Sequence, residues 1–188
     1  MLNKLSDFFW RIAGLKTFLA GLALDLLFNL LVMPWGAETF NDLSGHKVEV
    51  LDLKFSYSPE TARAIIGAYS EAARSFAIKF GLIADTVYPL AYTFFFTITL
   101  SWILKSLSGY NIKVKHLHLF PLLILFLDYC ENIGIASLMA SHPNFSDLQV
   151  YITSFLTSLK WGMVGILIAI TLSGLVALAG KRLLNRSN

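Results

Sequence analysis

The sequence predicts an all-α membrane protein: a bundle of four transmembrane helices, with a small extracytoplasmic strand-plus-helix segment between the first two spans. Three observations support this. The 188 residues are 56% hydrophobic and only 14% charged, whereas soluble domains average about 45–50% apolar and about 25% charged residues. Four apolar stretches are long enough to cross a hydrocarbon core of about 30 Å. One of them, 120–140, carries Asp128, Glu131 and Asn132 near its middle.

The chain opens with an amphipathic stretch, 1–16, in which apolar side chains share one side and Lys4 and Arg11 lie on the other. This pattern predicts a short interfacial helix. The n-region of a signal peptide is the alternative, but no small-residue cleavage site follows it. The first span is expected at 17–35, where Pro34 and the residues beside it end the helix.

The segment 37–80 is expected to form a small cap outside the membrane. Residues 46–57 alternate between apolar and polar side chains, which predicts a β-strand. Ser58 is suited to the N-cap of a following helix and Pro59 to its first position. That helix either lies on the membrane or runs outward into the second span, with a bend expected near Gly81.

The remaining spans are expected at 82–104, 117–140 and 147–179. A short basic turn, 106–115, separates the second span from the third. Ser146 and the glutamine three residues after it match a capping box at the start of the fourth span. No internal repeat is evident, so the chain is interpreted as a single membrane domain, 1–188.

Positive charges are distributed unequally between the two predicted sides of the bundle. Four spans place both termini on the same side, and Lys and Arg concentrate in cytoplasmic segments. The sequence therefore predicts a multi-pass protein of the inner membrane with both termini in the cytoplasm. The side with the termini carries Lys4, Arg11, Lys16, Lys105, Lys113, Lys115, Lys181, Arg182 and Arg186, and the opposite side carries Lys47, Lys54, Arg63, Arg74 and Lys79.

Ionisable residues inside the apolar stretches indicate a functional site, because a charge facing lipid costs at least a few kcal/mol. We expect these side chains to face one another, with Lys160 paired to Asp128 or Glu131. A proline four residues after Asp85 cannot donate to the Asp85 carbonyl, so a kink is expected at Pro89. The predicted ligand-binding residues are Asp25, Asn29, Asp85, Tyr88, Tyr92, Asp128, Glu131, Asn132 and Lys160.

Three functions fit this pattern. The first is binding, with transport as an extension, of a small cationic or amphipathic ligand: carboxylates supply charge and tyrosine rings supply cation–π contacts. The second is a structural or partner-binding protein whose buried polar groups fix helix packing. The third is an intramembrane enzyme acting on lipid, in which Asp128 or Glu131 serves as general acid or base.

Familiar catalytic and cofactor signatures are missing from the sequence. There is no HExxH, GxSxG, Walker A or CxxC motif, so a non-enzymatic role is favoured and no cofactor, metal site or nucleic-acid partner is predicted. His116 and His118 are expected at the cytoplasmic surface, away from the acids. The one cysteine, Cys130, excludes an intrachain disulfide. Membrane lipid is the expected partner, and the sequence does not define the oligomeric state.

Two local patterns are similar to known proteins. DTVYPLAY at 85–92 gives D-x-x-Y-P-x-x-Y, and LDYCENIG at 127–134 gives D-x-x-E-N. With the order span, long outer loop, three spans, they resemble a group of bacterial four-span membrane proteins without an assigned activity. The resemblance implies motif positions but no mechanism. Looser analogies extend to the sigma-2 receptor and sterol isomerase group, through buried acids, and to claudin-like proteins, through architecture.

Overall fold

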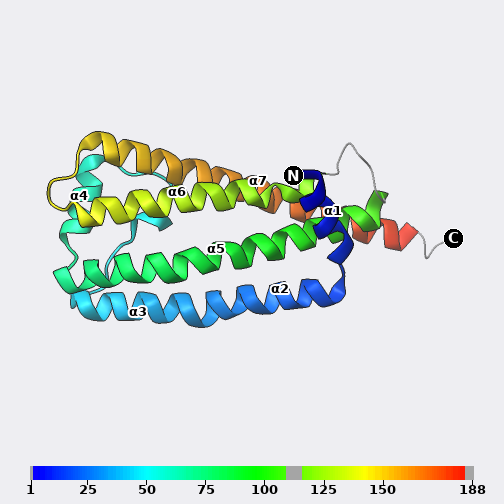
Figure 1. Ribbon diagram of the computed structural model, residues 1–188, viewed down its shortest axis with the longest axis horizontal. Helices are drawn as coiled ribbons and strands as arrows, with labels where there is room; N and C mark the ends of the chain where they lie inside the picture. The colour runs from blue at the N-terminus through cyan, green and yellow to red at the C-terminus, as the bar shows by residue number, and fades with distance from the viewer. Residues whose placement is uncertain (1, 109–115, 185–188) are drawn as a thin grey trace. The chain divides into compact units, whose positions relative to one another are not determined.

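The computed structural model describes residues 2–108 and 116–184. Residues 109–115 of the predicted basic turn, with Lys113 and Lys115, and the last basic residue, Arg186, lie outside these ranges, whereas residues 106–108 of that turn are helical. The described part of the chain contains helices and no β-strand (Figure 1). The elements are α1 (Leu2–Ile12), α2 (Leu15–Leu27), η1 (Phe28–Val32), α3 (Met33–Ser44), η2 (Leu51–Leu53), α4 (Pro59–Gly67), α5 (Glu71–Ser108), η4 (Leu117–Leu119), α6 (Pro121–Ala140) and α7 (Asp147–Leu184).

Four helical stretches in these ranges are long and apolar enough to cross a membrane. This confirms the predicted all-α fold with four candidate spans and indicates a membrane-embedded protein. The predicted strand at 46–57 is wrong: these residues form an extended chain interrupted by the short turn η2. The alternation also fails to separate buried from exposed positions, because Leu51 is buried whereas Leu53 and Phe55, at the same spacing, are exposed. The four stretches are Leu15–Ser44, Glu71–Leu107, Leu117–Ala140 and Asp147–Lys181.

The chain divides into two compact units, each built from separate parts of the sequence. Unit 1 contains residues 1–25, 91–124 and 163–188, and unit 2 contains residues 26–90 and 125–162. Helices α5, α6 and α7 each contribute to both units.

The first span is longer than predicted because the helix does not end at Pro34. The backbone passes from α2 into the π-helical turn η1 and then into α3, which continues to Ser44. Met33 donates to the carbonyl of Phe28, an i to i+5 bond, so the wider turn accommodates the proline near the start of α3. The helix ends at Gly45, whose φ of 75° suits a glycine.

The helix after Ser58 begins as predicted and stops sooner. Ser58 Oγ accepts from the Thr61 backbone N–H at 3.2 Å, which confirms the N-cap. The helix breaks at residues 68–70, before the bend expected near Gly81. Ser70 Oγ donates to the Leu43 carbonyl at 2.7 Å and accepts from the Ala73 N–H at 3.0 Å, so this one hydroxyl caps α5 and ties the break to the end of α3.

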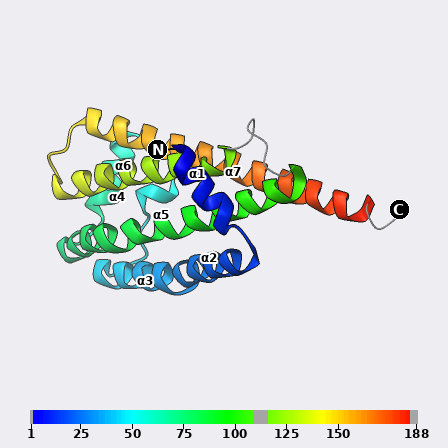
Figure 2. The ribbon, with the colours of Figure 1, turned by 45° about the vertical axis from the view of Figure 1, so that its right-hand side comes forward.

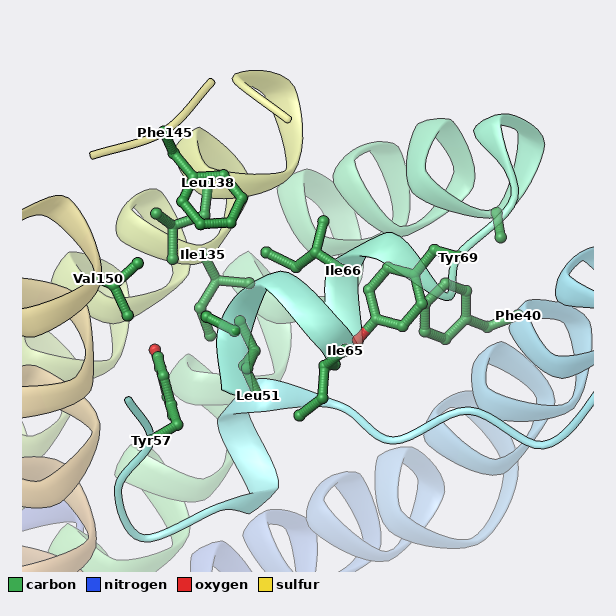
Figure 3. Packing of buried hydrophobic residues seen from close by; sticks show 12 residues of the cluster. Phe40, Leu51, Tyr57, Ile65, Ile66, Tyr69, Ile135, Leu138, Phe145 and Val150 are labelled. Carbon is green, nitrogen blue, oxygen red and sulfur yellow. The ribbon is translucent and has the colours of Figure 1, made fainter. Parts of the chain in front are cut away.

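Unit 2 has its own apolar core, formed by α4, the ends of α3 and α6, the start of α7 and the extended segment (Figure 3). Leu51, the first residue of η2, is 1% exposed, so the extended segment contributes to the centre of this core. The Tyr69 hydroxyl donates to the Glu49 carbonyl at 2.6 Å and holds the segment in place. Buried members of the core are Phe40, Leu51, Tyr57, Ala62, Ile65, Ile66, Tyr69, Ala73, Ile135, Leu138, Phe145 and Val150.

Unit 1 is packed mainly through aromatic and aliphatic side chains. Helix α1 forms separately from α2, as the amphipathic pattern predicted (Figures 1 and 2). Phe18 of α2 lies 5.4 Å from Trp102 of α5 between ring centroids. Leu100, Ile124 and Leu167 form a second buried cluster, contributed by α5, α6 and α7.

The turn between α6 and α7 contains the predicted capping box. The Ser146 backbone N–H donates to Gln149 Oε1 at 2.8 Å, and the Gln149 N–H donates to Ser146 Oγ at 3.3 Å. These reciprocal bonds start α7 at Asp147, and the carboxylate of Asp147 pairs with Arg63 of α4. The ion pair thereby holds the beginning of α7 against α4.

Candidate functional site

A buried ion cluster in unit 2 joins the middle of α6 to α7. Lys160 Nζ lies 3.6 Å from Asp128 Oδ1 and also pairs with the Glu131 carboxylate, which confirms the predicted pairing. Asp128 and Glu131 are one helical turn apart, so one ammonium can reach both. The side chains of Lys160, Asp128 and Glu131 are 11%, 12% and 0% exposed, so the cluster is closed to the surroundings.

Asp52 belongs to this cluster, and the sequence analysis missed it. It lies in η2 and interacts electrostatically with Lys160 and Asp128. Burial raises the pKa of the Asp52 carboxyl, while the nearby Lys160 ammonium acts in the opposite direction. From the sequence, this aspartate was only one of the polar positions of a predicted strand. No spacing rule connects it with a lysine so distant in the sequence.

The segment 51–57 docks on one side of α7. Trp161 Nε1 donates to the Asp52 carbonyl at 2.8 Å, and Ser158 Oγ donates to the Phe55 carbonyl at 2.8 Å. These two donors and Ser154 are spaced i, i+4 and i+7, which places them on one side of the helix. Non-helical backbone therefore obtains its hydrogen bonds from α7 side chains beside the ion cluster.

The sequence predicted tyrosine side chains beside the carboxylates, and Tyr57 lies there. Its backbone N–H donates to Ser154 Oγ at 2.8 Å, and its hydroxyl lies 3.4 Å from Thr157 Oγ1. Burial raises the pKa of Tyr57 to about 12, and the charges of Glu131 and Asp52 act in the same direction. The phenol therefore stays protonated at neutral pH and can donate a hydrogen bond within the site.

Asp85 and Asn132 meet at the proline of α5. Pro89 has no N–H for the Asp85 carbonyl, and Asn132 Nδ2 donates to that carbonyl at 3.1 Å. The Tyr129 hydroxyl similarly donates to the Thr86 carbonyl at 2.8 Å. Helix α5 runs from Glu71 to Ser108 with Pro89 inside it, and α6 supplies a donor for the carbonyl that the proline leaves without its helical partner.

The Asp85 side chain lies within electrostatic range of the cluster. It interacts electrostatically with Asp52, Asp128, Glu131 and Lys160. Four acidic groups therefore share the field of one lysine. The negative charges near this lysine outnumber the one positive charge, so the carboxylates repel one another.

The other predicted site residues lie apart from this cluster. The Tyr88 hydroxyl donates to Asn29 Oδ1 at 3.1 Å, and its ring packs against Phe28, so these side chains serve the contact between η1 and α5. Tyr92 belongs to unit 1 and packs against the cluster that contains Leu100. Asp25 also belongs to unit 1 and is half-buried.

Comparison with family models, with curated proteins and with solved structures gave no match to this chain. The described residues contain no group of three or more histidine, cysteine, aspartate or glutamate side chains able to hold a metal ion.

His118 is fully buried, in contrast to the surface position expected from the sequence, and its ring lies 5.7 Å from that of Trp10 in unit 1.

Proposed function

We propose that this chain is an integral membrane protein that binds a small cationic or amphipathic ligand at the carboxylate cluster of unit 2. The observation that supports the proposal is the imbalance of charge. Asp52, Asp85, Asp128 and Glu131 share the field of one cation, Lys160. A proton or an amine would reduce the repulsion among these acids, which is the physical basis for affinity.

Lys160 occupies the place that the ammonium group of a ligand would take. Its Nζ atom pairs with Glu131 and lies 5.5 Å from the centroid of the Trp161 ring. Carboxylates and an aromatic face are the groups that bind amines in proteins. A ligand reaches them when the segment 51–57 leaves α7, because that segment lies beside the cluster and is fastened to α7 by side-chain hydrogen bonds.

A structural role is the second candidate, and the closure of the cluster favours it. Glu131 is 0% exposed and paired with Lys160. Among the described residues, one open surface hollow lies beside His46 and another beside Lys4, and neither is lined by members of the cluster. In this role the ion pairs and the bond from Asn132 fix the register of α5, α6 and α7. Interhelical polar contacts of this kind average about 0.6 kcal/mol each.

Thermal unfolding of the purified full-length protein in detergent separates the two roles. Dodecylamine, an amphipathic amine, should raise the Tm of the wild type by several degrees. The rise should be lost in Glu131→Gln and retained in Glu60→Gln, because Glu60 is exposed on α4, away from the cluster. No response to dodecylamine or to pH in the wild type, together with a lower Tm of Glu131→Gln, would favour the structural role.

For topology, we propose the inner membrane with both termini in the cytoplasm, on the basis of the excess of Lys and Arg on the side with the termini. A phosphatase that is active only outside the cytoplasm, fused after Asn188, should be inactive. The same reporter inserted at Asn144, which is exposed in the turn between α6 and α7, should be active. The opposite pattern would reverse the topology without affecting the ligand proposal.

A further inference from the structure

The segment 51–57 lies deeper along the helices than an ordinary connecting loop. Two exposed charges, Glu38 on α3 and Lys79 on α5, mark one end of the apolar stretches in unit 2. They lie at a similar level, because Gly36 of α3 packs directly against the ring of Phe80. This level is where unit 2 leaves the hydrocarbon layer, since exposed charges lie outside it.

A series of contacts gives the depth of the segment below that level. Asp85 follows Lys79 by six residues, which is about 9 Å of helix. Asn132 binds the Asp85 carbonyl, and the preceding residue, Glu131, pairs with Lys160. Residue 161, next to that lysine, binds the Asp52 carbonyl. Asp52 therefore lies near the level of Asp85.

The length of the first span supports a boundary of the hydrocarbon layer at Glu38. Residues 17–37 lie between the charges of Lys16 and Glu38 and contain one ionisable residue, Asp25. At the helical rise they extend about 32 Å, which matches a hydrocarbon core of about 30 Å. The layer therefore fills the stretch up to Glu38 and includes the level of η2.

Two outward side chains of the segment are large and apolar, and the lysine between them, Lys54, pairs with Glu49. Leu53 is 70% exposed and Phe55 is 64% exposed, while Leu51 and Tyr57 point into the core of unit 2. The neighbouring helices also expose large apolar side chains near this level, among them Ile133 of α6. Together they form an apolar band with the properties of a lipid-facing surface.

Several backbone groups of the segment have the protein partners that a lipid environment requires. Non-helical backbone is tolerated at membrane depth only where protein groups complete its hydrogen bonds. The carbonyls of Asp52 and Phe55 accept from α7 side chains, and the N–H of Tyr57 donates to Ser154. The segment is thus built for an apolar environment on its outer side.

We propose that residues 51–57 re-enter the bilayer and that Leu53 and Phe55 contact lipid acyl chains. The segment then separates the ion cluster from the hydrocarbon layer. The inference rests on the membrane embedding proposed above but does not require the cluster to bind a ligand.

Single cysteines in the full-length chain test this proposal. The background is Cys130→Ser, which removes the one native cysteine. Leu53→Cys and Phe55→Cys are compared with Lys47→Cys, an exposed position nearer the cap, and with Phe155→Cys, an exposed apolar position on α7. Each variant is labelled in open membrane sheets with a charged maleimide. In a separate sample, each variant is labelled with bimane and placed in vesicles containing nitroxide-labelled phospholipid.

Positions 53 and 55 should react with the charged maleimide at least tenfold more slowly than position 47, and at a rate similar to position 155. Bimane at 53 and 55 should be quenched by nitroxide on the acyl chain and not by aqueous iodide. Labelling as fast as at 47, or quenching by iodide, would overturn the proposal. So would protection from both quenchers, which would show that protein covers these side chains. Neither readout depends on dodecylamine, so the two proposals can fail separately.

Discussion

The two units place polar side chains in apolar helices in different ways. In unit 1, buried hydroxyls bond back to the carbonyl four residues earlier on their own helix: Ser101 to Thr97 at 2.7 Å and Thr171 to Leu167 at 2.8 Å. Unit 2 contains such hydroxyls too, Thr153 and Thr157 on α7. In addition it buries carboxylates whose partner lies on another element, as Glu131 on α6 and Lys160 on α7 show.

This difference shows which polar residues carry information about a site. A hydroxyl satisfied within its own helix needs no neighbour and is tolerated anywhere along a span. A buried carboxylate needs a partner from another element, because an unpaired charge in an apolar environment is costly. Unit 2 therefore contains the candidate site, and the mutations below measure how far its stability depends on contacts between elements.

The largest effect is expected from Lys160→Met. Loss of the ammonium leaves the Asp128 and Glu131 carboxylates buried without their cation, and breaking a buried pair costs about 3–5 kcal/mol. The free energy of unfolding, measured in mixed detergent and SDS micelles at pH 7, should fall by that amount. Thr171→Val in unit 1 is the control and should cost less than about 1 kcal/mol.

A double variant sharpens this result. If the cost of Lys160→Met comes from uncompensated charge, Lys160→Met combined with Glu131→Gln should recover at least part of the lost stability. Equal losses for Lys160→Met and Thr171→Val would contradict the distinction between the two units.

A smaller effect is expected from Gly134→Ala. A Cβ at Gly134 would lie 2.7 Å from Thr153 Oγ1 on α7, so α6 and α7 would have to separate beside the ion cluster. Overpacking of this kind costs about 1–3 kcal/mol. Gly162→Ala is the matched control, because a Cβ there has no atom within 4 Å. Thermal unfolding should show a lower Tm for the first variant alone, and an unchanged Tm would contradict the close approach of the helices.

Asn132→Leu tests the contact at the proline. It removes the donor to the Asp85 carbonyl, which Pro89 cannot replace, and leaving a buried acceptor unsatisfied costs about 1–3 kcal/mol. We expect a loss near the lower end, because the side chain is only partly buried. Restoring the N–H with Pro89→Ala in the same chain should recover much of the loss. Additive losses would show that the two residues do not share this carbonyl.

The smallest effect is expected from Asp52→Asn and should depend on pH. The folded-state pKa of Asp52 is raised above its ordinary value of 3.8, so protonation favours the folded state. The wild type should therefore gain stability as the pH falls from 7 through that folded pKa toward 3.8.

Asp128, Glu131, Asp85, Lys160 and Tyr57 also interact with Asp52 and contribute to the same titration. The comparison is therefore the difference between wild type and variant. Asp52→Asn should be slightly more stable than wild type at pH 7, with a difference that disappears near pH 4. A difference independent of pH would assign the effect to packing.

Much of the fold could be predicted because its signals are local. The apolar stretches, the Ser58 N-cap and the Ser146 capping box depend on residues within a few positions of one another. The i, i+3 spacing of Asp128 and Glu131 similarly predicted one shared face. These features need no knowledge of the tertiary structure.

The site could be predicted only in part, because its remaining members come together through tertiary packing. The alternation in 46–57 did not predict the buried side, since Leu53 and Phe55 of its apolar set are exposed, and it could not show that α7 would hold the segment. Asp52 and Tyr57 were therefore missed, whereas Tyr88 and Tyr92 were included on the basis of their spacing from Asp85. One signal could have indicated the docked segment. Ser154, Ser158 and Trp161 carry hydrogen-bonding side chains at i, i+4 and i+7, on one side of α7.

The bond between α6 and α7 has a consequence for biogenesis. Asp128 and Glu131 are synthesised before Lys160, so α6 meets the membrane with two acids whose counter-charge has not yet emerged from the ribosome. Insertion of α6 alone would expose those acids to lipid, whereas entry together with α7 as one hairpin brings the lysine with them. Only residues 141–146 separate the two helices, a connection short enough for them to enter together.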